Sequence, residues 1–141
     1  MHEAPSFTAN LATGLDAVPG AREAAKWSDL HVAARRYAGA REDETQHRFG
    51  AAYQTFVELN AAAPHGVAHF AELGLRRIAT AARDRLLSAQ STAAASPTAV
   101  EEQLARAVQD FANTPFAADF ERVLDVWRRE RDFPAFTDTR G

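Results

Sequence analysis

The sequence contains no cysteine among its 141 residues. Disulfide bonds, thiolate metal sites and cysteine nucleophiles are therefore excluded. Glycine is sparse as well, and its seven copies are scattered, so the chain lacks the glycine-rich loop that holds a phosphate. No serine lies in a Gly-x-Ser-x-Gly elbow. These absences leave the question of enzymatic activity open but favour a protein that is not an enzyme.

Long apolar runs and an excess of basic residues are also missing. No stretch approaches ~18 consecutive apolar residues, so we expect no membrane span. The net charge is −3 and the basic clusters are short and lie beside acids, which argues against nucleic acid as a partner. The first residues show no basic segment followed by an apolar one. We therefore expect no signal peptide and a cytoplasmic location.

Alanine and a helical period dominate what remains. Alanine, the residue with the best helix propensity, recurs in runs at 61–63 and 93–95. Apolar residues return every three or four positions, and no segment alternates with period two. The sequence predicts an all-α fold, a single-domain bundle of four to five helices. We expect an N-terminal arm at residues 1–20, the bundle at 21–136 and a flexible tail at 137–141.

The first part of the bundle has one ambiguous break. A single interior glycine costs a helix only about 1 kcal/mol, so Gly39 leaves open whether residues 21–60 form one helix or two. The face predicted to be buried in the first of these turns contains Trp27, Leu30, Ala34 and Tyr37. The next helix is expected over residues 64–90. Its predicted inner stripe consists of Val67, Ala71, Gly74, Ile78, Ala82 and Leu86.

The last two helices carry clearer start signals. Residues 91–98 are small and polar and predict a linker. Thr98 and Glu101 match a capping box, which predicts a helix from about residue 99. Thr114 is a good N-cap and Pro115 a good first residue for the final helix.

Two groups of residues have the chemistry of metal ligands. Glu44 and His47 show the Glu-x-x-His spacing that ferritin-like di-iron bundles use on one helix face, although such bundles need two copies. His65, His69 and Glu72 share a face at i, i+4 and i+7, and paired histidines at i, i+4 can chelate a metal. Helical steps place both groups away from the predicted core. Iron, zinc or manganese binding is therefore an alternative to two solvated polar faces; no other cofactor is indicated.

The aromatic residues near the C-terminus suggest a third use of the bundle. Phe116, Phe120 and Trp127 could line a pocket for a small apolar ligand. At helical spacing, a buried core is the simpler interpretation of the same residues.

The middle of the chain, residues 34–87, resembles the phasins, helical proteins that coat bacterial polyester storage granules. The likeness rests on Arg36-Tyr37, on Glu44-Thr45-Gln46 with Phe49, and on the segment 60–64 with the alanine-rich helix after it. The resemblance implies a non-enzymatic binding or coating role and assigns no functional residue. The aromatic C-terminal third departs from it.

Our first functional hypothesis is a non-catalytic helical interaction, scaffold or coating protein that acts through amphipathic helix faces. Its partner would be another protein or a second copy of the chain in a homo-oligomer. The alternatives are a metal-binding, ferritin-like bundle and a binder of small apolar ligands.

Overall fold

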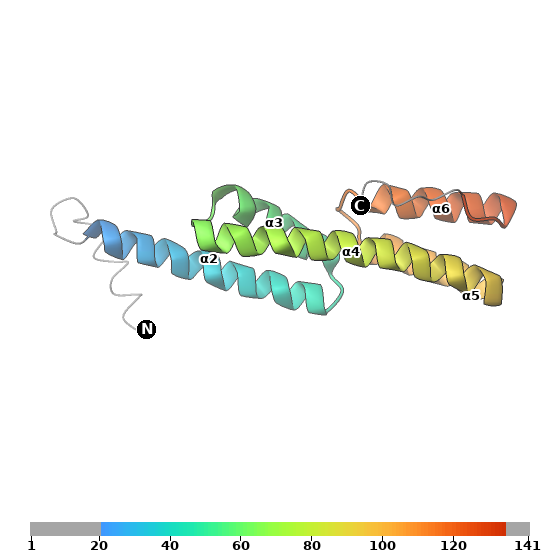
Figure 1. Ribbon diagram of the computed structural model, residues 1–141, viewed down its shortest axis with the longest axis horizontal. Helices are drawn as coiled ribbons and strands as arrows, with labels where there is room; N and C mark the ends of the chain where they lie inside the picture. Colours follow the sequence, from blue (N-terminus) through green and yellow to red (C-terminus); the bar gives the residue numbers. More distant parts are fainter. Residues whose placement is uncertain (1–20, 135–141) are drawn as a thin grey trace.

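The computed structural model describes residues 21–134, and within that range all regular secondary structure is helical (Figure 1). The helices are α2 (Ala21–Thr45), α3 (Phe49–Ala62), α4 (His65–Ala95), α5 (Pro97–Asp110) and α6 (Ala117–Glu130). The predicted all-α bundle is confirmed, with five helices in the described range. The predicted arm, the last residues of the predicted bundle and the predicted tail lie outside it.

Helix α4 is the long element that joins the other four. Its 31 residues span about 46 Å at the rise of an α-helix. Helices α2 and α3 pack against its first part, and α5 packs against its last part and carries α6 (Figure 1). We call α2, α3 and residues 65–84 the α2–α3 half. Residues 86–95 with α5 and α6 form the α5–α6 half.

The chain between α2 and α3 reverses at residues 46–48, so residues 21–60 contain two helices. His47 takes the left-handed conformation with φ 61°, and the Arg48 guanidinium binds the Asp43 carboxylate at 2.9 Å across the turn. Gly39 lies inside α2, where a side chain would meet nothing within 4 Å. The glycine is therefore a tolerated helix residue, and the break occurs where a polar turn closes.

The predicted buried face of α2 was partly correct. Leu30 and Tyr37 pack against the core, whereas Trp27 and Ala34 are exposed. Ala33 and Ala40 are the buried residues of this helix, with Leu30 and Tyr37 packed partly against them. Trp27 instead exposes 48% of its surface. Small alanine side chains allow α2 to approach its neighbours closely, and a bulky indole on that face would hold the helices apart.

The predicted linker at 91–98 was also wrong. Helix α4 continues to Ala95 and α5 begins at Pro97, so only Ser96 lies between them. Alanine favours helix, and Ala89 is buried against the core, which extends α4 through this segment. Pro97 occupies the first turn of α5, where the missing N–H costs nothing.

The capping box predicted at Thr98 does not form. Thr98 follows the first residue of α5, and no side chain caps that helix. The Glu101 carboxylate instead accepts a hydrogen bond from Arg128 Nε of α6 at 2.7 Å. Its second oxygen lies 3.5 Å from Arg131 Nη1. The acid that was expected to cap α5 therefore ties α5 to α6.

The predicted N-cap at Thr114 was wrong: α6 begins at Ala117, its N-cap is Phe116, and no side chain caps it. The buried Thr114 hydroxyl donates to the Phe111 carbonyl at 2.7 Å and accepts from the Phe116 N–H at 3.2 Å. Those two bonds hold the turn that separates α5 from α6.

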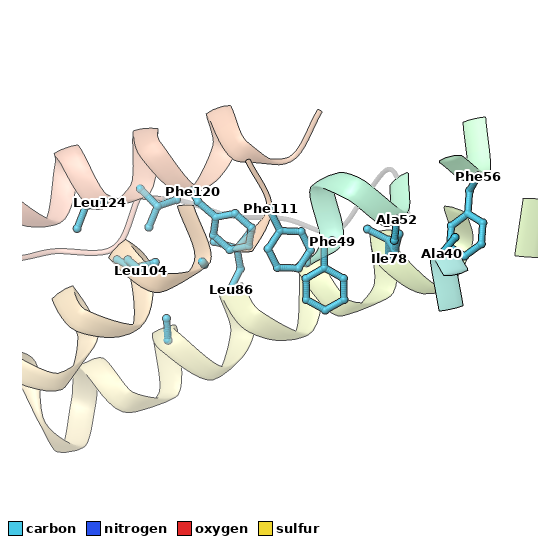
Figure 2. Packing of buried hydrophobic residues seen from close by; sticks show 14 of the residues in the cluster. Ala40, Phe49, Ala52, Phe56, Ile78, Leu86, Leu104, Phe111, Phe120 and Leu124 are labelled. Atoms are coloured by element: carbon cyan, nitrogen blue, oxygen red, sulfur yellow. The ribbon is translucent and has the colours of Figure 1, made fainter. Parts of the chain in front are cut away.

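One continuous core runs through both halves (Figure 2). The predicted stripe of α4 is buried throughout, which confirms that prediction. At the junction of the halves, the rings of Phe49 in α3 and Phe111 after α5 stack with their centroids 4.4 Å apart. Arg85 lies over both rings and binds Asp110 at 2.7 Å. The aromatic pair and the arginine thus join the two halves.

Two glycines mark places where packing leaves no room for a side chain. A Cβ on Gly50 would lie 2.0 Å from the Ala112 carbonyl oxygen, at the same junction. A Cβ on Gly74 would lie 2.6 Å from the Phe56 ring, between α4 and α3. Both positions therefore require glycine.

Candidate interaction surface

Large apolar side chains are exposed mainly on the α2–α3 half. Among the residues that the structure describes, α5 and α6 expose none of this kind, and the last part of α4 exposes only Leu87, at 38%. The α2–α3 half exposes Trp27, Val32, Val57 and Phe70. The exposed large apolar side chains are therefore concentrated on the α2–α3 half.

Phe70 is the exposed end of an aromatic cluster that reaches the core. Its ring centroid lies 6.1 Å from that of Tyr37 in α2, and the Tyr37 centroid lies 5.7 Å from that of buried Phe56. The ring nevertheless exposes 54% of its surface. It is held by α2 and α4 while most of its face remains available for contact.

Trp27 lies in the second turn of α2. The first turns of α2 project beyond the turn between α3 and α4 (Figure 1). An indole on a projecting helix is well placed to enter an apolar partner because it combines a large apolar area with few rotatable bonds.

An open groove of about 620 Å³ lies where the end of α3 leaves α2. Val32, exposed by 57%, lies in it with Ala33 and Leu59. Its charged residues are Lys26, Asp29 and Arg36 from α2 and Glu58 from α3. Arg36 forms an ion pair with Glu58 across the groove.

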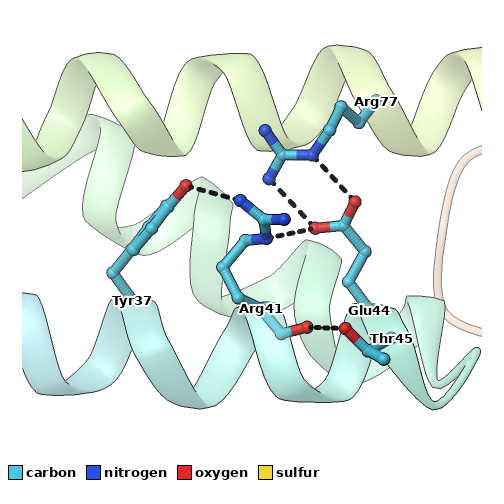
Figure 3. Close-up of polar contacts among 5 residues, drawn as sticks. All are labelled: Tyr37, Arg41, Glu44, Thr45 and Arg77. Carbon is cyan, nitrogen blue, oxygen red and sulfur yellow. Dashed lines mark hydrogen bonds and ion pairs between the residues drawn. The ribbon is translucent and has the colours of Figure 1, made fainter.

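A polar cluster joins α2 to α4 near the end of α2 (Figure 3). Arg77 donates to both oxygens of the Glu44 carboxylate, from Nε at 2.8 Å and from Nη2 at 3.0 Å. Arg41 Nε lies 3.4 Å from the same carboxylate, and Arg41 Nη1 donates to the Tyr37 hydroxyl at 3.5 Å. The hydrogen bonds to Glu44 raise the pKa of the Arg77 guanidinium above its ordinary value. Paired in this way, Arg77 and Glu44 fix α2 against α4.

The Glu-x-x-His pair does not lie on one helix face, contrary to the sequence prediction. Glu44 belongs to the last turn of α2 and points toward α4, with only 15% of its side chain exposed. His47 lies in the following turn and stacks on Phe49 at a centroid distance of 5.3 Å. A metal at Glu44 would have to displace Arg77.

The second predicted group lies on the first turns of α4. His65 and His69 are exposed there, as the helical steps predict. The Glu72 carboxylate forms an ion pair with Arg76 at 3.0 Å. Within residues 21–134, no three histidine, aspartate or glutamate side chains come together as metal ligands do. Metal binding remains a prediction.

The C-terminal aromatics lie in or beside the core. Phe120 is fully buried with its centroid 5.1 Å from that of Phe111, and Phe116 meets Phe111 edge to face. Trp127 is buried beside Phe133. These residues therefore belong to the core or pack against it, and binding of a small apolar ligand stays a prediction.

Val32 and Phe70 are surface residues that the sequence analysis missed. Each lies one position before a buried alanine, Ala33 and Ala71, so each is about 100° from the packed face. This offset from the buried stripe can be read from the sequence, and it would have predicted that both residues are exposed.

Comparisons with family models, with curated proteins and with solved structures each found no match to this chain. The resemblance to phasins therefore remains a prediction. Of the helices in the described range, none has the combination of length and apolar character that crossing a membrane requires.

Proposed function

We propose that this chain is a non-catalytic helical protein that coats or docks on apolar surfaces through its α2–α3 half. The observation that carries the proposal is the exposure of Trp27, Val32, Val57 and Phe70 on that half. The resemblance to phasins supports the same role, and a coating protein of a storage particle would act in the cytoplasm.

The exposed rings supply the driving force for such binding. Fully burying a large apolar side chain contributes roughly 1.5–3 kcal/mol, and Trp27 and Phe70 each have about half of their surface available. Together they account for a tenfold or larger change in affinity, since 1.4 kcal/mol corresponds to a factor of ten.

In this function, Arg77 and Glu44 fix the position of α2 relative to α4 and so the arrangement of the exposed apolar residues. Their ion pair holds α2 beside α4, and α2 carries Trp27 while α4 carries Phe70. Losing the pair would allow α2 to move without removing any of the apolar contacts.

Adsorption to polyester particles and to a triolein emulsion tests the proposal. The chain should float or sediment with both. The double variant Trp27→Ser/Phe70→Ser should bind at least about tenfold more weakly. The matched control is Leu87→Ser, which removes an exposed apolar side chain from the other half and should bind as the parent does. Equal binding by the parent and the double variant would contradict the proposal.

A further inference from the structure

The groove between α2 and α3 displays charges in a self-complementary order. Asp29, Val32, Ala33 and Arg36 follow one another at steps of three, one and three, and all four line the groove. On a helix these steps keep the residues on one face. The negative Asp29 thus lies three residues before the apolar pair Val32-Ala33, and the positive Arg36 lies three residues after it.

That order fits an antiparallel copy of itself. When two α2 helices pair about a two-fold axis between Val32 and Ala33, each Asp29 lies opposite Arg36 of the second copy. Each Val32 then lies over the second copy's Ala33, which is nearly buried and lines the groove. A two-fold contact requires such a self-complementary surface, since each partner presents the same residues. The parallel arrangement would instead place each charge beside its own kind.

The charges of the groove can accept this partner. Asp29 forms no ion pair with the residues that the structure describes, so its carboxylate is available. Arg36 binds Glu58, but a guanidinium has five N–H donors and can hold a second carboxylate. Each contact would therefore join two acids, Glu58 and Asp29 of the second copy, to one arginine.

The shape of α2 favours the same arrangement. Its first turns project beyond the α3–α4 turn and have no neighbouring helix among the described residues (Figure 1). In the antiparallel pair, residues 21–28 of each copy lie along residues 37–44 of the other. Trp27 lies on a different side of α2 from the groove, so the pairing leaves its indole exposed.

We infer that the groove binds α2 of a second copy of this chain, forming a two-fold symmetric dimer centred on Val32. The inference deepens the proposed function and rests on it, because it names the partner of one face of the α2–α3 half. Contacts limited to one helix pair and its flanks belong to the small, exchanging class of interfaces. The dimer should therefore dissociate on dilution.

Sedimentation velocity of the full chain from about 1 μM to about 500 μM tests the dimer, since contacts of this class dissociate within such a range. The parent should change from monomer to dimer across the series. Asp29→Arg and Arg36→Asp should each weaken dimerisation at least about tenfold, because each creates two like-charge contacts per dimer. The double variant Asp29→Arg/Arg36→Asp restores opposite charges and should recover most of the affinity.

Two further variants separate the contact from general effects of charge and folding. Arg35→Asp makes the same charge change as Arg36→Asp, but at a residue that does not line the groove. This variant should dimerise as the parent does. Val32→Asp places a charge on the axis and should abolish the dimer while helix content by circular dichroism stays unchanged, because Val32 is exposed in the monomer.

The inference is overturned if the parent remains monomeric throughout, or if the double charge exchange fails to recover the affinity lost by the single variants. A chain that dimerises only after removal of residues 1–20 also overturns it, because its own N-terminal segment would then occupy the groove. Adsorption to triolein tells the two proposals apart. Asp29→Arg should adsorb through Trp27 and Phe70 as before, so a failed dimer with intact adsorption rejects only the dimer.

Discussion

Both halves of this molecule bury large apolar side chains, but the α2–α3 half also exposes several of them. In the α5–α6 half these residues are inside: Phe111 and Phe120 are fully buried, and Trp127 nearly so. In the α2–α3 half much of the buried interface is alanine, while Trp27 and Phe70 are outside. The α2–α3 half, although packed around Phe56 and Ile78, is thus the half that displays large apolar side chains.

The difference follows from the area that each contact buries. A buried alanine removes little apolar surface from water, so an alanine interface contributes less free energy than one made of phenylalanine and leucine. The close approach of α2 is therefore supported by other interactions, among them the bidentate pair between Glu44 and Arg77. Because charged contacts hold α2 in part, the large apolar side chains of the α2–α3 half can stay exposed and contact a partner.

The largest expected effect comes from the junction of the halves. Phe111→Ala removes a fully buried ring that contacts Phe49 and Phe120 and should lower the free energy of unfolding by about 3–5 kcal/mol. Urea denaturation measures this change. Leu87→Ala, on the exposed side of α4, should change stability by less than about 0.5 kcal/mol. Equal effects of the two variants would mean that the junction does not join the halves.

Two glycines provide the next comparison. Gly50→Ala should destabilise the protein by about 1–3 kcal/mol, because the new Cβ meets the Ala112 carbonyl. Gly39→Ala should stabilise it by up to about 1 kcal/mol, since the site is open and helical. Thermal denaturation followed by circular dichroism measures both. A stabilising Gly50→Ala would show that the halves do not approach each other closely at this point.

A smaller effect is expected where charges hold α2. Glu44→Gln weakens the pair with Arg77 and should cost about 1 kcal/mol, with faster amide hydrogen exchange in α2 than in α6. The matched control is Glu72→Gln, whose partner Arg76 lies on the same helix, so its loss should leave exchange in α2 unchanged. Equal exchange in α2 for both variants would remove the proposed role of the Glu44 pair.

The smallest effect concerns acid and the α5–α6 half. The hydrogen bond from Arg128 holds the pKa of Glu101 below its ordinary value of 4.5. The unfolded chain binds this proton more readily, so the pair stabilises the folded state above about pH 4.5. The contribution is lost as the pH falls through the lower folded pKa. Glu101→Gln should therefore show a shallower loss of stability with acid, measured by urea denaturation at several pH values; an unchanged slope would contradict the pairing.

The sequence predicted the helices well because helical period is a local property. The stripe of α4 from Val67 to Leu86 was correct, and the last helix was expected within two residues of its start at Ala117. The break between α2 and α3 was left open because it depends on the turn at His47. The left-handed conformation of this residue cannot be predicted from any one residue type.

The surface was harder to predict than the core because rotation of a helix is decided by its neighbours. Trp27 was expected inside because it lies at helical spacing from Leu30, yet alanines at positions 33 and 40 allow the closer packing. Glu44 was expected in solvent because its partner, Arg77, is 33 residues away in the sequence. Contacts between distant segments decided both outcomes, and one sequence does not contain them.

Hydrogen exchange of the full chain on polyester particles tests the division between the halves most directly. Binding should slow exchange in the first turns of α2 and of α4, around Trp27 and Phe70, and leave α5 and α6 as they are in the free protein. Slower exchange confined to α5 and α6 would contradict the account, because it would place the binding surface on the half whose large apolar side chains are buried.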